Sequence, residues 1–583
     1  MENKETDKYD PTATPPNRHA VLEIRAGQLP ELADQAEQVL VKHDDNLYQR
    51  SGYLARVIST KAETVHGIRR PAGSVCLIPV DVDFLLDRLN RLMAWKKWSA
   101  RLEKLVTCNA PRPVANTLMS RSGQWGFKSL VGIVTAPTLR PDGTVLDRPG
   151  YDASTGLLFV ASEPFPNIPK HPTRSQAQAA LDYLVTDLLG SFTFVKNHDR
   201  SAALSAIATA LVRPSLRTAP LHGATAPTRG SGKTLLTDVV AMIATGRPAN
   251  VTTFTPDPDE QRKRILTILM SGYQVVNLDN LEVPLEGEAL CTALTSETFS
   301  DRILGTQRQA TAPTCVTWMA TGNNLIARGD MTRRVIYCAL DPKCERPEER
   351  HFEKDLYQWI PNNRPALVVA VLTFLRAYVA AGRPSQKLTP FGGFDDWSSL
   401  IRCALVWLGE EDPLLSRARE EDDPIRNRLR LLILAWFHTF KSIPSTTTEL
   451  VLQANATLLD DMRREIHCNP ELYAVASEHF SNRRNEISAQ LIGEFIRKNR
   501  LRIEAGARFE EGGDYGTRKL WKLTITDQSS FDEELRKFLN RVEKGAQGVR
   551  GAKGELTDDQ EPSHPLHPFP ASAVNFAENK EVF

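Results

Sequence analysis

One short segment constrains the fold of this chain more than any other: Pro227–Thr234, with the sequence PTRGSGKT. It matches the phosphate-binding template G-x-x-x-x-G-K-[ST] except at its first position, where Pro227 stands in place of glycine and removes one N–H. An apolar helix pattern, LLTDVVAMIATG, follows directly. Such a loop aims backbone N–H groups and a helix N-terminus at phosphate oxygens. We therefore expect an α/β fold with a P-loop ATPase core.

The side chains of this loop predict a nucleotide site. Lys233 is expected to reach the β- and γ-phosphates of ATP, and the Thr234 hydroxyl to bind Mg²⁺. A surface Gly-Ser turn with a chance lysine is the alternative, and the apolar helix that follows disfavours it. The residues expected to bind the nucleotide are Thr228, Arg229, Gly230, Ser231, Gly232, Lys233 and Thr234.

A second strand pattern, YQVVNLDN, ends in Asp279. An apolar strand that ends in an acid is the Walker B arrangement, so we expect Asp279 to hold Mg²⁺ together with Thr234. Many ATPases place a glutamate next, to activate the attacking water, but here the position is Asn280. Glu282 is the preferred candidate base and Glu260 a weaker one. The alternative is that Asn280 positions the water and that hydrolysis is slow.

Two more motifs follow the same strand-end logic. VTWMATGNN ends in Asn323 and Asn324, where a ring ATPase has a "sensor 1" side chain at the γ-phosphate. Asn323 is the better match, Asn324 the fallback, and a plain turn the alternative. The segment GDMTRRVIY places Arg333 and Arg334 directly before an apolar strand. We expect one of them to act on the phosphates, as an arginine finger supplied to a neighbouring subunit or as a sensor 2. The alternative is a solvated pair of arginines at the start of the strand. The sequence does not choose between the two arginines.

Together these motifs resemble the helicase ATPase core of phage and plasmid replication proteins. This group comprises the primase-helicase type ATPases of prophages and mobile elements, related to superfamily-three helicases and broadly to AAA+ proteins. A wider likeness to a recurrent prophage protein covers roughly residues 25–525. It is carried by the segments LYQRSGYLARV, APTLRPDGTVLDRPGYDASTGLLF, LVRPSLRTAPL, ALTSETFSDRILG and ATGNNLIARGDMTRR.

The resemblance implies a hexameric ring with ATP sites between subunits and single-stranded DNA threaded through its centre. It also implies that a hairpin between the Walker B and sensor 1 strands grips the DNA. Residues 300–310, SDRILGTQRQA, have a strand-turn-strand pattern with a cation on each arm. Arg302 and Arg308 are therefore candidate phosphate contacts, with a plain solvated hairpin as the alternative.

Composition limits what else the chain can be. It has 583 residues, 41% hydrophobic and 25% charged, with a net charge of +1. These values are typical of a globular protein with several domains, and any nucleic-acid surface must be a local patch. No apolar run is long enough to span a membrane and no signal peptide is recognisable. The eight cysteines form no C-x-x-C pair. We expect no zinc or disulfide framework and a cytoplasmic location in a bacterial host cell.

Changes in composition and pattern along the chain predict six regions. They are a disordered tail at 1–18, an α+β collar or DNA- or partner-binding region at 19–190, the P-loop ATPase core at 191–350, a helical region at 351–445, a winged-helix-like domain at 446–525, and a mostly disordered tail at 526–583.

The winged-helix expectation comes from a helix, ISAQLIGEFIRKN, followed by a hairpin with a Gly-Gly-Asp turn. Residues 481–522 hold ten basic and six acidic residues, a net charge of +4. Arg497, Lys498 and Arg500 at the helix end are candidate DNA contacts. A protein-docking domain is the alternative, because cations at a helix C-terminus also interact favourably with the helix dipole.

Near the N-terminus, VDVDF offers Asp81 and Asp83 as a D-x-D pair that could hold primase metals. We favour a simpler interpretation, in which Asp83 caps the helix FLLDRLNRL and Asp81 lies just before it.

The sequence thus predicts an ATP- and Mg²⁺-dependent DNA helicase or translocase, working in replication of a prophage or mobile element with a separate primase or polymerase. An AAA+-type initiator or loader that binds DNA without processive unwinding is the main alternative. A scaffold that binds nucleotide only structurally is a third hypothesis.

Overall fold

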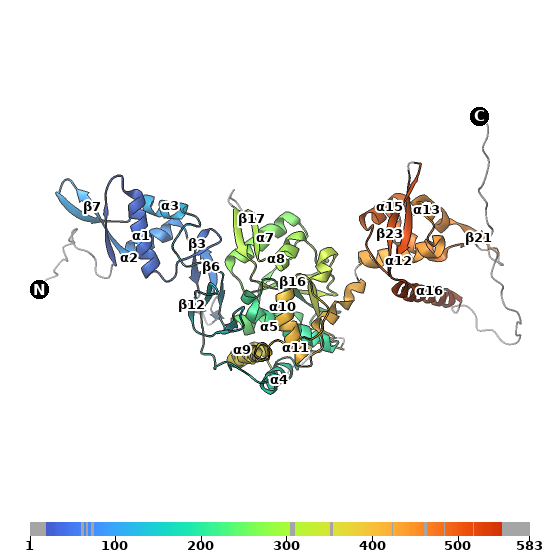
Figure 1. Cartoon of the computed structure of the whole chain (residues 1–583), viewed down its shortest axis with the longest axis horizontal. Coiled ribbons are helices and arrows are strands. Elements are labelled where there is room, and N and C mark those ends of the chain that lie inside the picture. Colours follow the sequence, from blue (N-terminus) through green and yellow to red (C-terminus); the bar gives the residue numbers. More distant parts are fainter. Residues whose placement is uncertain are drawn as a thin grey trace, which may run out of the picture. The chain divides into compact units, whose positions relative to one another are not determined.

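The structure is a computed structural model. It describes residues 19–59, 63–65, 68–70, 75–302, 309–344, 346–349, 354–422, 424–459, 463, 465–482, 484–516 and 518–550. The chain divides into two compact units, Met1–Asp423 and Pro424–Phe583, and each is described by itself. Both units mix helices with sheets (Figure 1).

The first part of unit 1 mixes three helices with several small sheets. Its elements are β1 Ala20–Ile24, α1 Leu29–His43, β2 Tyr48–Arg50, β3 Tyr53–Ile58, β4 Glu63–Val65, β5 Ile68–Arg70, β6 Cys76–Pro79, α2 Val82–Leu92, β7 Met93–Ser99, β8 Lys104–Cys108, α3 Arg112–Ser120, β9 Gly132–Val134, β10 Thr138–Leu139, β11 Val145–Leu146, β12 Gly150–Asp152 and β13 Leu157–Phe159. One sheet has the order β1-β7-β8 and another β2-β3-β6. The β2–β3 turn places Ser51 and Gly52 at φ 54° and 81°, the left-handed region in which glycine is favoured.

The two acids near residue 82 serve the start of α2. The Asp81 carboxylate accepts the Phe84 N–H at 2.7 Å, so Asp81 is the N-cap. Asp83 lies in the first turn and forms an ion pair with Arg112 at 2.8 Å. The expectation that Asp83 caps the helix was wrong, because the helix already begins at Val82. Across the described part of the chain, no three His, Cys, Asp or Glu side chains gather as a metal site.

The centre of unit 1 is a five-stranded parallel sheet with the order β15-β16-β19-β14-β20. The strands are β14 Leu221–Ala226, β15 Asn250–Thr252, β16 Val275–Leu281, β19 Thr317–Asn323 and β20 Val335–Ala339. β14 is buried along its whole length, as expected for a parallel strand covered on both faces. The chain passes from central β14 to edge strand β15, so the order reverses beside β14. In open α/β sheets, ligands bind at the carboxyl ends of strands at such a reversal.

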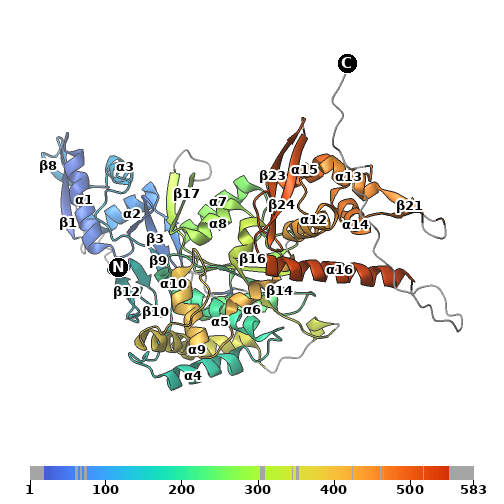
Figure 2. The same ribbon diagram turned by 45° about the vertical axis from the view of Figure 1, so that its right-hand side comes forward.

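Helices cover this sheet and pack on one another. They are α4 Arg174–Tyr183, α5 Asn197–Val212, α6 Lys233–Thr245, α7 Pro258–Ser271, α8 Glu288–Thr295 and α9 Leu356–Ala380, with short helical segments at 184–188, 213–215, 329–333, 347–349, 395–407 and 413–422. A hairpin of β17 Thr298–Arg302 and β18 Gln309–Pro313 packs against α7, and the two views in Figure 1 and Figure 2 agree on this. The strand-turn-strand pattern expected for 300–310 is confirmed for the described residues of both arms.

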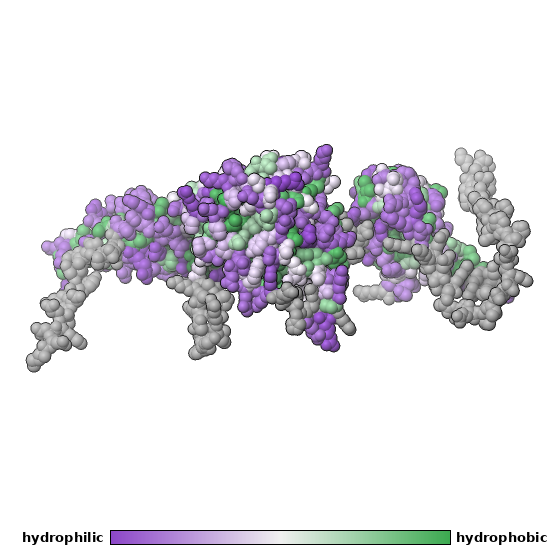
Figure 3. Space-filling model, turned by 90° about the horizontal axis from the view of Figure 1, so that it is seen from below, coloured by the Kyte–Doolittle hydropathy of each residue, from purple (hydrophilic) through white to green (hydrophobic). Residues whose placement is uncertain are grey.

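The long helix α9 is apolar enough to cross a membrane by length and composition, but 61% of that stretch is buried inside the protein. The buried Arg364 side chain of α9 fixes the helix to its neighbours by hydrogen bonds. The guanidinium donates to Ile243 O at 2.9 Å, Ala244 O at 3.0 Å and Thr135 O at 3.1 Å. These contacts join α9 to the end of α6. On the face in Figure 3, hydrophilic side chains dominate and hydrophobic ones form small scattered areas.

Buried His222 on β14 makes the stability of unit 1 depend on pH. Its ring is 1% exposed, and Nε2 lies 3.0 Å from Ser205 Oγ while Nδ1 has no hydrogen-bond partner among the described residues. Burial lowers the pKa of His222 to about 3. In the unfolded chain the imidazole has a pKa of about 6.5, so between these values the unfolded state binds the proton and the folded state does not.

Lowering the pH from 7 to 5 should therefore cost unit 1 about 2 kcal/mol through His222 alone. Urea unfolding at both pH values, on wild type and His222→Gln, measures this. Other groups titrate equally in the two proteins, so the difference in pH dependence isolates His222. Equal pH dependence in the variant would contradict the prediction.

The described residues of unit 2 form four helices, two hairpins and a long final helix. The elements are α12 Pro424–Phe440, α13 Thr447–Asn455, β21 Thr457–Leu459, β22 Glu465–His467, α14 Pro470–Phe480, α15 Ala489–Lys498, β23 Ala507–Tyr515, β24 Arg518–Ile525 and α16 Gln528–Arg550. The core includes Leu429, Ile433 and Trp436 from α12, so this unit begins earlier than the expected boundary at 446.

Two further expectations for this region differ from the structure. Gly512-Gly513-Asp514 is not the hairpin turn, because β23 continues to Tyr515 and accommodates the glycines as an irregularity in register. Residues 528–550, expected within a disordered tail, form α16. Phe531 and Phe538 of α16 are buried in the core of unit 2, and Leu535 packs beside them at helical spacing.

Candidate functional site

The loop between β14 and α6 has the geometry of an anion cradle. Gly230 and Gly232 have φ of 72° and 87°, which side chains with a Cβ rarely adopt. Gly232 is the N-cap of α6, and no side chain of the described residues caps its first turn. Inside the loop, Ser231 Oγ donates to Thr228 O at 2.7 Å and so closes it. The N–H groups of this turn, at the positive end of a 13-residue helix, are placed to bind an anion.

Lys233 connects this loop to the end of β19. Its Nζ donates to Thr228 O and to Asn323 Oδ1, both at 2.8 Å. Burial lowers the pKa of the Lys233 ammonium, and the nearby Asp279 carboxylate opposes that shift. Asn324 instead turns away at φ 49°, exposed to solvent, with its backbone N–H on Ala226 O. Of the two candidate asparagines, Asn323 is the one that lies beside Lys233.

In the part of the chain that the structure describes, every hydrogen bond to the Asp279 side chain goes to one oxygen. Its Oδ1 accepts from Thr321 at 2.6 Å, Asn277 at 3.1 Å and Thr234 at 3.4 Å. A shift in register after Leu278 lets the strand bulge here, and Asn280 adopts φ 52° with its N–H on Thr321 Oγ1. The carboxylate is thereby oriented toward the Thr234 hydroxyl. Oδ2 accepts no hydrogen bond from the described residues.

Sequence reasoning missed Thr321 and Asn277. Both lie two residues before a candidate, Asn323 and Asp279, and so share a strand face with it. That spacing was the available signal. The hydrogen bond from Thr321 to Asp279 depends on the pairing of β16 with β19, which the sequence does not specify, whereas the bond from Asn277 lies within β16.

The structure does not bring a second carboxylate into this cluster. The Glu282 side chain is 72% exposed and lies 3.8 Å from exposed Arg229. Glu260 forms an ion pair with Arg264 at 2.9 Å on α7. Among the described residues, neither carboxylate hydrogen-bonds to Lys233 or Asp279. Arg229 itself extends outward from the loop.

Arg333 and Arg334 lie at the opposite end of the sheet from this loop. Leu221, the first residue of β14, pairs with Val335 and donates its N–H to Arg334 O at 3.0 Å. β14 has six residues, so the loop after it is about 16 Å or more away along the strand. A sensor 2 role at the site of the same subunit is therefore wrong for both arginines.

The two arginines differ in burial. The Arg334 side chain is 10% exposed and pairs with Asp330, while also donating to Asp330 O at 2.8 Å. Arg333 also pairs with Asp330, but its side chain is 60% exposed. Only Arg333 presents its guanidinium at the surface, where a second molecule could be reached.

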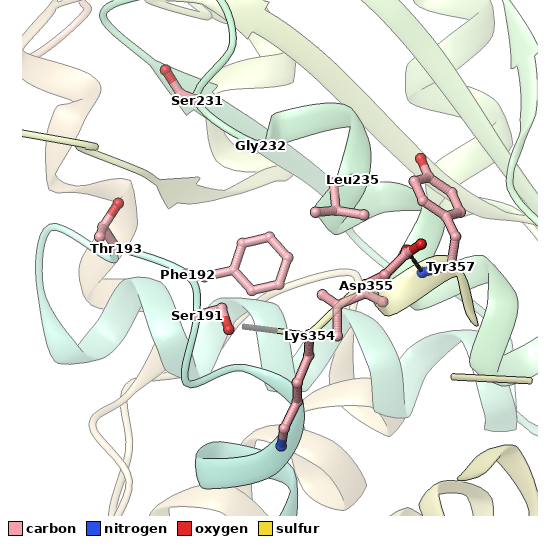
Figure 4. A pocket seen from close by; sticks show the side chains of 10 residues that line it. Ser191, Phe192, Thr193, Ser231, Gly232, Leu235, Lys354, Asp355 and Tyr357 are labelled. Carbon is pink, nitrogen blue, oxygen red and sulfur yellow. Dashed lines mark hydrogen bonds between the residues drawn. The ribbon is translucent and has the colours of Figure 1, made fainter. Parts of the chain in front are cut away.

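A pocket of about 350 Å³ adjoins the loop and is lined by Phe192, Gly232, Leu235, Leu356 and Tyr357, among others. Figure 4 shows the Phe192 ring pointing into the space between Leu235 and Asp355. A Cβ on Gly232 would lie 3.7 Å from this ring, so the aromatic face reaches the loop itself.

Tyr357 is held in place at the rim of this pocket. Its hydroxyl donates to Asp238 at 2.6 Å, which ties the start of α9 to the second turn of α6. The Lys354 side chain points away from the Phe192 ring, and its Nζ donates to Asp187 Oδ1 at 3.2 Å. The pocket, lined by apolar side chains together with Ser191, Thr193 and Asp355, therefore lies directly beside the anion cradle.

The candidate nucleic-acid contacts are scattered. Arg302 is exposed at the end of β17, and Arg308 lies outside the described residues. Arg497 and Lys498 occupy the last turn of α15. Arg500 forms an ion pair with Glu511 at 2.8 Å, so its charge is already partly neutralised.

Comparison with known proteins gives limited likenesses. No protein-family model and no curated protein matches the chain. It is similar to the A-form apo structure of the NrS-1 C-terminal region, at 12% identity and a TM-score of 0.33, over 74% of this chain and 96% of that one. It is also similar to a second structure of that region, at 11% identity and a TM-score of 0.35, over 84% of this chain and 98% of that one. A third likeness is to the X-ray structure of JCV helicase, at 10% identity and a TM-score of 0.19, over 44% of this chain and 71% of that one. With TM-scores this low, function has to be argued from the residues of this chain.

Proposed function

We propose that unit 1 is a P-loop ATPase of the AAA+-like, superfamily-three-related type. One observation carries the proposal: Lys233, Asp279 and Asn323, on three different elements, converge with Thr234 at one edge of a parallel sheet. Bonds of 2.6–3.4 Å join these side chains and Thr321. A core without a ligand gains nothing from gathering an ammonium and a carboxylate around an uncapped helix N-terminus.

The residues present fit ATP and Mg²⁺. The N–H groups of 229–234 would hold the phosphates, with Lys233 at the β- and γ-phosphates. Thr234 Oγ1 and the unshared Oδ2 of Asp279 are the oxygens suited to Mg²⁺, a hard cation. The metal would neutralise charge that develops on the phosphates. The Asn323 side chain, which accepts a hydrogen bond from Lys233 in this structure, would position the attacking water or a γ-phosphate oxygen.

The pocket at Phe192 would take the adenine base, stacked on the aromatic ring. Base–aromatic stacking contributes about 1–3 kcal/mol, so Phe192→Ala should raise KM for ATP about tenfold with kcat nearly unchanged. Steady-state ATPase kinetics measure this. Inhibition by inorganic triphosphate, which has no base, should be equal in both proteins and shows whether the loop is intact. An unchanged KM would remove the base from this pocket.

We propose that the activity drives a DNA helicase or translocase, in a ring that is hexameric, for replication of a prophage or mobile element in the cytoplasm of a bacterial host. Three features support this. Arg333 is exposed and far from its own site, as an arginine finger supplied to a neighbour would be. The β17–β18 hairpin, which carries Arg302, lies in the sequence between β16 and β19, the strands that provide Asp279 and Asn323. The helix and hairpin of α15, β23 and β24 fit a winged helix, with Arg497 and Lys498 toward DNA and a separate primase or polymerase as partner.

The test is the rate of ATP hydrolysis by the full chain with and without single-stranded DNA, together with the particle mass with and without nucleotide. We expect turnover that DNA stimulates and a ring that nucleotide stabilises. Nucleotide binding without any turnover would leave only a scaffold role and would overturn the proposal.

A second candidate is an AAA+-type initiator or loader that hydrolyses ATP slowly and does not unwind DNA. Its support is the position after Asp279, where Asn280 carries no carboxylate and Glu282 turns toward Arg229. A strand-displacement assay on a forked duplex separates the two. ATP-dependent strand separation favours the motor, and turnover without separation favours the loader.

A further inference from the structure

The β7–β8 hairpin is a concentrated basic segment with an exposed aromatic residue. Residues 93–108 hold four cations, Lys96, Lys97, Arg101 and Lys104, against the single acid Glu103. The whole chain has a net charge of +1, so this +3 is local. The Trp98 residue is 61% exposed and Leu102 is 50% exposed.

The other end of the same strand shows why this exposure is unusual. Trp95 on β7 is fully buried, and its indole N–H donates to Leu89 O at 3.1 Å. The core of this part includes Trp95 and also the buried Trp125. Trp98, three residues after Trp95, contributes no such burial. The exposed indole is therefore available to contact another molecule.

Three of the four cations of the hairpin, Lys97, Arg101 and Lys104, differ from several charged residues nearby in having no counter-charge among the described residues. Elsewhere in this part, Arg25, Arg91 and Arg112 form ion pairs with Glu23, Asp87 and Asp83. For Lys97, Arg101 and Lys104, no described residue supplies an ion pair. Their charge is thus free to meet an external anion.

The strand register sets where these charges lie. Lys104 is opposite Ser99, and Lys97 is two residues before Ser99, so the two lysines are diagonal neighbours on one face. Like charges so placed repel, unless an anion lies between them. Arg101 is in the connection between the strands. Trp98, opposite Leu105, is on the other face of the same ribbon. Figure 1 and Figure 2 place this ribbon at the outer edge of the N-terminal part.

We propose that the β7–β8 hairpin binds a single strand of nucleic acid that passes around its exposed end. Phosphates would lie at Lys97 and Lys104 on one face and at Arg101 in the connection, and an unpaired base would stack on Trp98 on the opposite face. Positive side chains along the backbone combined with an aromatic platform are the usual means of binding single strands. The cores of protein–protein interfaces are depleted of lysine, which disfavours a protein partner. This site is separate from the nucleotide site and does not depend on hydrolysis.

The experiment is fluorescence anisotropy of a labelled oligo-dT with the full chain, without nucleotide, over a series of salt concentrations. A triple variant, Lys97→Ala with Arg101→Ala and Lys104→Ala, should raise Kd at least tenfold. Three lost phosphate contacts should also reduce the slope of log K against log salt by about 2. Trp98→Ala should raise Kd about tenfold while leaving the salt slope unchanged.

The matched control is Arg25→Ala with Arg91→Ala and Arg112→Ala, which removes the same charge from cations that are already paired. It should bind oligo-dT like wild type. Circular dichroism melting of each variant confirms folding. Lys233→Ala should also bind normally, so a failed ATPase proposal would leave this site standing. Wild-type affinity in the triple variant or in Trp98→Ala, or tighter hairpin-dependent binding of duplex DNA, would overturn the proposal.

Discussion

Replacing Lys233 by alanine is expected to lower ATP turnover by about 10²–10³-fold or more, the cost of losing one preorganised donor to developing phosphate charge. No other described cation lies within hydrogen-bond reach of Asn323 Oδ1 and Thr228 O, the partners of Lys233 Nζ. Steady-state phosphate release at saturating ATP measures the effect.

The same substitution should leave the fold nearly unchanged. Its two partners are a loop carbonyl and an amide oxygen at the rim of the site, where water can replace the ammonium. Lys42→Ala, at an exposed position in the last turn of α1, is the matched control and should hydrolyse ATP like wild type. Turnover above a tenth of the wild-type rate in a folded Lys233→Ala protein would remove Lys233 from the phosphates, and with it the proposed site.

The centre of this site could be predicted from sequence because each part is a local signal. A glycine-rich loop before an apolar helix, and polar residues at the ends of apolar strands, need no knowledge of tertiary structure. The carboxyl ends of parallel strands must then share one edge, which brings Asp279 and Asn323 together. The structure places both where that logic puts them. Thr321 required the register of β16 with β19, which depends on long-range pairing, whereas Asn277 contacts Asp279 within β16.

The burial of side chains also distinguishes candidate residues that the sequence alone could not tell apart. Arg333 and Arg334 are chemically equivalent in the sequence, and only the short turn at 329–333 buries one and exposes the other. The helix α16 was missed because Gly, Lys and Glu near its end suggest disorder. Its apolar residues, Phe531, Leu535 and Phe538, have helical spacing, but their partners lie about a hundred residues earlier on α12. Long-range packing of this kind overrides local composition.

The largest other effect is expected at the paired arginines, and they should behave differently. Arg333→Ala should reduce turnover by about 10³-fold, the contribution typical of an arginine finger, while the melting temperature stays near wild type. An exposed ion pair such as Arg333 with Asp330 adds only about 0–1 kcal/mol. Arg334→Ala leaves a buried site without its hydrogen bonds and should destabilise unit 1 by about 1–3 kcal/mol.

Mixing inactive variants tests whether Arg333 acts in a neighbouring subunit. Lys233→Ala lacks the lysine but keeps the finger, and Arg333→Ala has the reverse defect. If each site takes its finger from the next subunit, a mixed ring contains some sites with both groups, and turnover recovers partly when the two proteins are mixed. Lys233→Ala mixed with Asp279→Asn is the control, because both changes damage the same half of the site and no mixture restores it. Arg333 lies some 16 Å from its own loop along β14, so it can reach phosphate only in another copy. Recovery equal to the control, or an Arg333→Ala protein with full turnover, would rule out the finger and favour a solvated ion pair at the start of β20.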